Sequence, residues 1–264
     1  MEHRSFISSD YWGKVRILLR ERYGAELKVL GLCAPAGDLC PRDTIRWVQP
    51  ETPIDDPNIR RDAVLPRDAD PSMFDPEGTW TVARRIVCEI TYAADQKKPY
   101  CESTVLIHNT ESVRLPLRTV TSGEKETAER ILSDYIRQKE GDFSFGDSAQ
   151  MHVHAGTIAR YDLQKRITTV PVELHFVRLG SIAFATNPFE LFLNYGNRIR
   201  ARSRARQTFL IQLSNGYYGY LPTAAAERGS HYSAYVSSGF AGHAGGDLLV
   251  DVTLAELNRM FGTD

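Results

Sequence analysis

This 264-residue sequence has few cysteines, no long apolar run and no excess of either charge. Each of these three features excludes a class of protein. Because no apolar run approaches the roughly 20 residues that cross a bilayer, we do not expect an integral membrane protein. Lys and Arg total 32 against 33 Asp and Glu, so the net charge of −1 provides no field that would attract nucleic acid. The four cysteines have neither CxxC spacing nor the density of a disulfide scaffold, which fits reduced thiols or at most one disulfide.

The N-terminal segment also lacks the uninterrupted apolar stretch and small-residue cleavage site of a signal peptide. We therefore expect a cytoplasmic location for the chain as given. Its composition, 42% hydrophobic and 25% charged, is that of an ordinary globular protein. A chain of this length buries roughly 75% of its unfolded surface, so a core forms without disulfides. No internal repeat divides the chain, and we expect one domain over residues 1–264.

The spacing of apolar residues predicts helices and strands that alternate along the chain. The predicted helices cover residues 10–23, 79–93, 123–141, 187–203 and about 247–261. The predicted strands cover residues 27–33, 103–109, 113–120, 151–156, 171–186 with an internal turn, and 208–214. This order indicates an α/β fold in which helices pack on a mixed β-sheet. Residues 41–78, rich in Pro and Asp, are expected to form a long surface excursion.

A cysteine follows the first predicted strand in the sequence AGDLCP, residues 36–41. Pro35, Gly37 and Pro41 break regular structure there, so Cys40 is expected on a constrained turn, where α/β proteins often carry their chemistry. A free cysteine is also commonly a small buried hydrophobe. A reactive thiol needs a cation, a metal or a helix N-terminus to lower its pKa. On spacing alone, a structural thiol is the favoured interpretation of Cys40, and a reactive thiol is the alternative.

The sequence NPFE, residues 187–190, follows an apolar strand and opens a predicted helix. Asn187 suits the N-cap, Pro188 the first helical position and Glu190 the third position of a capping box, and this interpretation is favoured. The alternative is that Glu190 binds a cation or exchanges a proton with a ligand, because the strand-to-helix turn fixes its carboxylate in place.

Three tyrosines, Tyr217, Tyr218 and Tyr220, lie on a glycine-punctuated turn in the sequence NGYYGY. Packing of the rings with their hydroxyls hydrogen-bonded is the favoured interpretation. The functional alternative is a phenol that stabilises an oxyanion or contacts a metal.

Two further patterns admit a functional and a structural interpretation. His152 and His154 alternate on the predicted strand 151–156 and would face the same side, a spacing that can bind metal, but hydrogen-bonded histidines are favoured because no further ligand lies nearby. The five arginines between residues 198 and 206 suit a helix C-terminus, where cations interact favourably with the helix dipole. Contact with anionic lipid is the alternative.

Taken together, the AGDLCP, NPFE and NGYYGY segments resemble, in the same order, three signatures of the neutral/alkaline non-lysosomal ceramidase family. The flanking segments ISSDYWG (residues 7–13) and VELHFVRLG (residues 172–180) are similar as well, so the resemblance covers most of the chain, and covers it loosely between residues 44 and 150.

The resemblance implies a zinc amidohydrolase that cleaves the amide bond of ceramide or a related N-acyl compound, with a lipid substrate as partner. The nucleophile turn corresponds to Gly37, Asp38 and Cys40, and Cys40 replaces the serine of the family. Glu190 and Tyr220 correspond to the two non-histidine ligands of the single zinc ion. A first-shell carboxylate and phenol would hold the ion while it polarises the amide carbonyl.

Two departures from the family pattern keep the activity open. Cys40 can bind zinc as well as attack a substrate, because thiolates do both. The histidine ligands of the family lie upstream of the ISSDYWG-like segment, and His3 does not replace them. We therefore expect the C-terminal portion of a catalytic domain that is incomplete as given, and whether the chain is an active enzyme is left open. The alternative function is an inactive fragment or binding module that keeps part of the scaffold.

A third hypothesis is a thiol-dependent acyl hydrolase that uses Cys40 with His231 or His243. Both histidines belong to a Gly- and Ser-rich segment, residues 231–247, that we expect to be a mobile loop near the site.

Overall fold

The computed structural model describes residues 7–39, 47–48, 68–69, 76–96 and 105–262. These residues fall into two compact units. The first unit comprises Met1–Gly31 and Cys40–Tyr100, and the second comprises Leu32–Leu39 and Cys101–Asp264. The single domain expected over residues 1–264 stays a prediction.

The first unit is built on two helices, α1 (Asp10–Tyr23) and α2 (Pro76–Asp95), with a short antiparallel pair, β1 (Trp47–Val48) and β2 (Asp68–Ala69). Val15, Leu19 and Ala83 form the buried contact between the helices, as their spacing predicts. Because α2 begins at Pro76, the excursion predicted to reach residue 78 ends earlier. Most of that excursion lies outside the described residues.

The prediction of a buried strand over residues 27–33 is wrong, because these residues form no strand. Leu27 and Val29 pack against the helical core, whereas Leu30 is 82% exposed. The carbonyls of Leu27 and Val29 accept hydrogen bonds from arginine side chains of α1 at 3.1 and 3.5 Å and not from a neighbouring strand. An apolar run is consistent with a strand but does not supply the partner that a strand needs.

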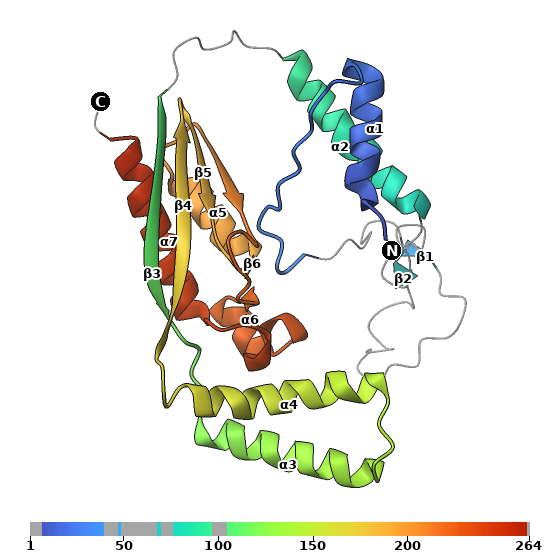
Figure 1. The fold of residues 1–264 in the computed structure, drawn as a ribbon, viewed down its shortest axis with the longest axis vertical. Coiled ribbons are helices and arrows are strands. Elements are labelled where there is room, and N and C mark those ends of the chain that lie inside the picture. Colours follow the sequence, from blue (N-terminus) through green and yellow to red (C-terminus); the bar gives the residue numbers. More distant parts are fainter. Residues whose placement is uncertain (1–6, 40–46, 49–67, 70–75, 97–104, 263–264) are drawn as a thin grey trace. The chain divides into compact units, whose positions relative to one another are not determined.

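A four-stranded mixed sheet forms the centre of the second unit, in the order β3-β4-β5-β7. The β3–β4 and β4–β5 pairs are antiparallel and the β5–β7 pair is parallel. Helices α5 and α7 pack on one face of this sheet, over a core that includes Leu174, Phe176 and Leu249 (Figure 1). The predicted mixed α/β class is confirmed. The elements are β3 (Leu106–Pro116), β4 (Thr169–Leu179), β5 (Ile182–Thr186), α5 (Leu193–Arg202), β7 (Gln207–Ile211) and α7 (His243–Met260).

The second unit also contains several short elements, which come after β5 in the chain. Strands β6 (Glu190–Leu191) and β8 (Tyr220–Leu221) pair in parallel and form a second sheet. Helix α6 (Ala224–Gly229) and the 3-10 helices η2 (Tyr232–Ala234) and η3 (Val236–Ser238) come next in the chain.

Strand β3 replaces two shorter strands that the sequence predicts over residues 103–109 and 113–120. It pairs with β4 without interruption from Leu106↔Leu179 to Pro116↔Thr169. The polar residues in the middle of β3 were interpreted as a turn. They include no glycine or proline, and on alternate positions they face solvent, as expected for a sheet with one exposed face.

Helices α3 (Ser122–Lys139) and α4 (Phe145–Leu163) lie side by side (Figure 1). Helix α3 was predicted, but α4 replaces the strand predicted over residues 151–156. A capping box between Ser144 and Asp147 begins α4, and the four-residue alternation in MHVH is too short to oppose a nineteen-residue helix. His152 and His154, two positions apart on a helix, therefore face different directions.

The acid sensitivity of the α3–α4 pair is expected to depend on Asp147, which is only 4% exposed. Hydrogen bonds from Lys139 (2.6 Å), Ser144 and Tyr135 hold the pKa of its carboxyl well below the ordinary 3.8. Since the pKa in the folded state is lower than in the unfolded state, this stabilisation is present above pH 3.8 and is lost as the pH falls further.

We expect Asp147→Asn to lower the melting temperature at pH 7 and to flatten its dependence on pH below 4, as measured by circular dichroism. Asp142→Asn, at an exposed position between the same helices, is the control and is expected to behave like the wild type. Equal pH profiles for Asp147→Asn and the wild type would contradict this account.

Candidate functional site

Strands β6 and β8 bring Glu190 and Tyr220 together, because the two residues are direct partners in the parallel register. The capping interpretation of NPFE is wrong. Helix α5 begins only at Leu193, and Glu190 lies on a strand before it. Asn187 instead closes a local turn in which its Oδ1 accepts a hydrogen bond from the N–H of Phe189 at 3.1 Å. The structure thus leaves the Glu190 carboxylate out of any helix cap.

The N-terminus of α5 is capped by a residue from a distant part of the sequence. The Asp38 carboxylate accepts a hydrogen bond from the N–H of Leu193 at 2.7 Å, across 155 positions. A carboxylate is a strong acceptor at a helix N-terminus, where the helix dipole favours negative charge. Asp38 thereby fixes residues 36–39 to the start of α5.

Gly37 packs directly behind Glu190. Its N–H donates to the Leu191 carbonyl at 2.9 Å, and a Cβ at this position would overlap the Glu190 carbonyl oxygen. The side chain of Gln212, 5% exposed, accepts from the N–H groups of both Ala36 (3.2 Å) and Leu191 (2.8 Å). Sequence reasoning missed Gln212, which carries no motif signal. Cys40 lies outside the described residues.

The tyrosine turn joins the same cluster. Tyr217 donates to Glu190 Oε1 at 3.2 Å, and Tyr218 donates to the Pro171 carbonyl at 2.9 Å. The Tyr220 ring meets Tyr232 of η2 edge to face, with centroids 5.7 Å apart. Burial, followed by hydrogen bonding with Glu190 and Tyr232, raises the pKa of Tyr220, and burial together with the Glu190 charge raises that of Tyr217. The tyrosine turn therefore makes both kinds of contact: the ring of Tyr220 packs on Tyr232, and the hydroxyl of Tyr217 binds the Glu190 carboxylate.

A cavity of about 310 Å³ opens beside this cluster. It is lined by Tyr217, Tyr218 and Tyr220, by His152 and Arg160 of α4, and by residues 237–240. The guanidinium of Arg160 stacks on Phe240, 3.6 Å from the ring centroid, donates to the Gly239 carbonyl at 2.6 Å, and has its pKa lowered by burial. The helix that carries His152 thus contributes a wall of the candidate site, whereas His154 lines a separate cavity of about 410 Å³.

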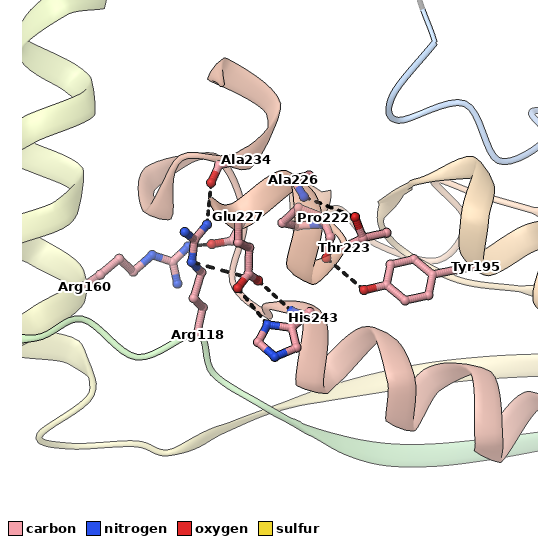
Figure 2. A network of polar contacts seen from close by, with 10 residues as sticks. Arg118, Arg160, Tyr195, Pro222, Thr223, Ala226, Glu227, Ala234 and His243 are labelled. Carbon is pink, nitrogen blue, oxygen red and sulfur yellow. Dashed lines mark hydrogen bonds and ion pairs between the residues drawn. The ribbon is translucent and has the colours of Figure 1, made fainter. Parts of the chain in front are cut away.

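A polar network holds the segment that follows the tyrosine turn, as Figure 2 shows. Arg118 donates to the Ala234 carbonyl at 2.5 Å and lies 4.0 Å from the Glu227 carboxylate. Glu227 accepts from the N–H of His243 at 2.6 Å and contacts its Nδ1 at 2.7 Å. The expectation of a mobile loop over residues 231–247 is wrong, because this segment contains η2, η3 and the start of α7 and buries Ala234.

Tyr195 and Thr223 anchor the neighbouring end of α6 in the same view (Figure 2). The buried Tyr195 hydroxyl donates to the Pro222 carbonyl at 2.8 Å, and Thr223 accepts from the N–H of Ala226 at 3.3 Å. His243 is engaged by Glu227, so the thiol hypothesis that pairs it with Cys40 gains no support from the described residues.

Among the described residues, no group of three or more His, Cys, Asp and Glu side chains is arranged to hold a metal ion. Helices in the described ranges are all too short or too polar to cross a bilayer. Cys33 and Cys88, the two cysteines in those ranges, are exposed free thiols.

Replacing Gly37 with alanine is expected to lower the free energy of unfolding by about 1–3 kcal/mol, because the new methyl group displaces backbone atoms of β6. Urea denaturation measures this change. Gly123→Ala is the matched control, since a Cβ there meets nothing within 4 Å and alanine favours the first turn of α3. A Gly37→Ala variant as stable as Gly123→Ala would refute the close approach of the turn to β6.

No protein-family model and no curated protein sequence matches the chain. Its arrangement of helices and strands is nevertheless similar to that of a solved neutral ceramidase. The likeness is to the crystal structure of neutral ceramidase from Pseudomonas aeruginosa, with a TM-score of 0.56, 17% sequence identity and 98% of this chain covered. This chain spans 42% of that ceramidase chain. A ceramidase complexed with C2 matches 69% of this chain and 35% of its own length, at 14% identity and a TM-score of 0.39.

The comparison with the Pseudomonas enzyme confirms the ceramidase-like fold that the three sequence motifs imply. At 17% identity it extends to the fold and not to the chemistry of the site.

Proposed function

We propose that the chain carries part of a zinc amidohydrolase site that cleaves the amide bond of ceramide or a related N-acyl compound. One observation carries this proposal: β6 and β8 set Glu190 beside Tyr220, and the Gly37–Asp38 turn is hydrogen-bonded to the segment that follows Glu190. Three segments that are distant in the sequence thus meet at one place. They are the segments that resemble the ceramidase signatures.

Two oxygen donors at this place suit zinc as part of a larger ligand set. Glu190 offers a carboxylate and Tyr220 a phenol oxygen at adjacent strand positions, and zinc accepts oxygen ligands beside histidine. Glu190 and Tyr220 would hold the ion, and residues outside this pair would complete its coordination. When bound, zinc polarises the amide carbonyl and activates a nucleophile.

The residues of the chain itself have three tasks in this proposal. Tyr217 donates a hydrogen bond to Glu190 and so limits the rotation of its carboxylate. Asp38 and Gly37 hold the turn that leads to Cys40, which acts as the nucleophile or as a further zinc ligand. The adjacent cavity of about 310 Å³, walled by tyrosines, offers space for part of an acyl substrate.

The proposal is tested by supplying the purified protein with zinc and measuring the release of fatty acid from ceramide and from other N-acyl amides. We expect zinc-dependent release that a chelator stops. A protein that binds no zinc and hydrolyses no substrate would instead be the inactive binding module.

A Cys40→Ser variant separates the two roles of the thiol. Zinc-dependent activity retained in this variant indicates the ceramidase mechanism with an exchangeable nucleophile. Loss of activity in a normally folded variant indicates chemistry that requires the thiol.

A further inference from the structure

The cavity beside the tyrosine turn contains a positive charge that the described part of the chain does not neutralise. Arg160 lines this cavity with His152, Ser237, Ser238 and the tyrosines, and no Asp or Glu is among the described residues of the lining. The Arg160 side chain is partly buried. Burial lowers the pKa of its guanidinium, and no acidic neighbour in the described ranges offsets that effect. Removing a charge from water without a counter-ion costs free energy, so this cation lacks a partner.

The hydrogen bonds of the guanidinium are incomplete as well. Nη2 donates to the Gly239 carbonyl at 2.6 Å, and the guanidinium carbon lies 3.6 Å from the centroid of the Phe240 ring. Nη1 is buried and has no hydrogen-bond partner among the described residues. Most buried polar groups in folded proteins are hydrogen-bonded, so an orphaned donor indicates a missing acceptor. A carboxylate fits this need, because it brings a negative charge and accepts from two guanidinium nitrogens at once.

Backbone pairing ties this guanidinium to the proposed zinc-binding residues. The Arg160 side chain extends from α4 toward the segment after the tyrosine turn (Figure 2). Gly239, which accepts its hydrogen bond, forms an antiparallel bridge with Gly219, the residue before Tyr220. Arg160 and Tyr220 line the same cavity. A ligand in this cavity therefore contacts the guanidinium with one end while its other end lies at Tyr220.

We propose that Arg160 binds a carboxylate of the substrate, so that the site takes N-acyl amino acids. This inference rests on the proposed function, because it names the class of amide that the same site cleaves. Guanidinium, imidazole and hydroxyl groups line the cavity, and they suit the polar amine portion of an N-acyl compound better than its alkyl chain. In an N-acyl amino acid the carboxylate belongs to that amine portion. The volume of about 310 Å³ accommodates a small amino-acid unit.

A matched pair of ligands tests this inference by binding alone. N-octanoylglycine carries a carboxylate, and N-octanoylglycinamide has the same chain with a neutral amide in its place. The full chain is titrated calorimetrically with each ligand in the presence of a chelator, so that zinc takes no part. We expect the acid to bind at least about 10-fold more tightly than the amide, because a hydrogen bond to a charged group is worth that factor or more. Equal affinities, or no binding of the acid, would overturn the inference.

Variants of Arg160 assign the preference to this side chain. Arg160→Gln should weaken binding of the acid at least about 10-fold and leave the affinity for the amide unchanged. Arg160→Lys keeps the charge but not the planar fork, and should retain part of the preference. Arg166→Gln, at an exposed position just after α4, is the control and should bind both ligands like the wild type. A preference for the acid that survives in Arg160→Gln, or equal losses for both ligands, would count against Arg160 as the carboxylate site.

Comparison with hydrolysis separates this inference from the proposed function. Binding selective for the acid, without zinc-dependent hydrolysis of any amide, would support the carboxylate site and reject the amidohydrolase. Zinc-dependent hydrolysis of ceramide by a protein that shows no preference for the acid would support the amidohydrolase and reject the carboxylate site.

Discussion

Glu190→Gln is expected to weaken zinc binding at the candidate site by at least about 100-fold and to lower zinc-dependent amide hydrolysis by a similar factor. Even the loss of a residue that only supports a ligand costs about 10–100-fold, so the loss of a charged ligand costs at least as much. Glutamine keeps the shape of the side chain and the strand register with Tyr220. The change therefore reports on the charge and not on folding.

The tyrosine turn provides a matched pair of variants for the same prediction. Tyr220→Phe removes the phenol next to Glu190, whereas Tyr218→Phe removes one that is bonded to the Pro171 carbonyl in the same turn. We expect the first variant to lose zinc affinity and activity and the second to keep both, with zinc competition and substrate hydrolysis as the measurements. Equal effects of the two substitutions would argue against Tyr220 as a ligand.

Glu227→Ala is expected to destabilise the second unit by about 3 kcal/mol. The substitution leaves the Arg118 guanidinium, whose side chain is 16% exposed, without its carboxylate, and it removes the acceptor for the N–H of His243. Breaking a buried ion pair by removing one partner costs about 3–5 kcal/mol, and partial exposure places this pair at the lower end. Urea denaturation of the full chain measures the loss.

An exposed ion pair serves as the control for Glu227→Ala. Asp162 and Lys165 lie 2.8 Å apart with more than half of each side chain exposed, so Asp162→Ala should cost less than about 1 kcal/mol. A Glu227→Ala variant no less stable than Asp162→Ala would show that the network in Figure 2 does not hold the segment after the tyrosine turn.

The sequence predicted those elements whose pattern is long and bounded by clear signals. Helix α3 has eighteen residues with helical spacing of its apolar side chains, and this spacing predicted it. The strand predicted over residues 151–156 was wrong because its pattern is short. Four alternating residues fit a strand or a helix equally well, and these residues belong to α4. Strand β3 was divided in two because polar residues on its solvent face resemble a turn when the partner strand is unknown.

The sequence predicted which residues form the candidate site, but not how they are arranged in space. Glu190, Tyr220 and the Gly37–Asp38 turn could be named from their motifs, but local rules assigned Glu190 to the helix cap that Asp38 provides instead. Such a cap spans 155 positions, and no local pattern contains it. Gln212 was missed for the same reason, since only the folded chain brings Ala36 and Leu191 to its side chain.

The most direct test of the central claim is the position of zinc in crystals of the protein, located by anomalous diffraction at the zinc absorption edge. The account predicts a zinc ion bound by the Glu190 carboxylate and the Tyr220 hydroxyl, with the turn at Gly37 beside it. Zinc found only elsewhere, with Glu190 turned away from Tyr220, would contradict it.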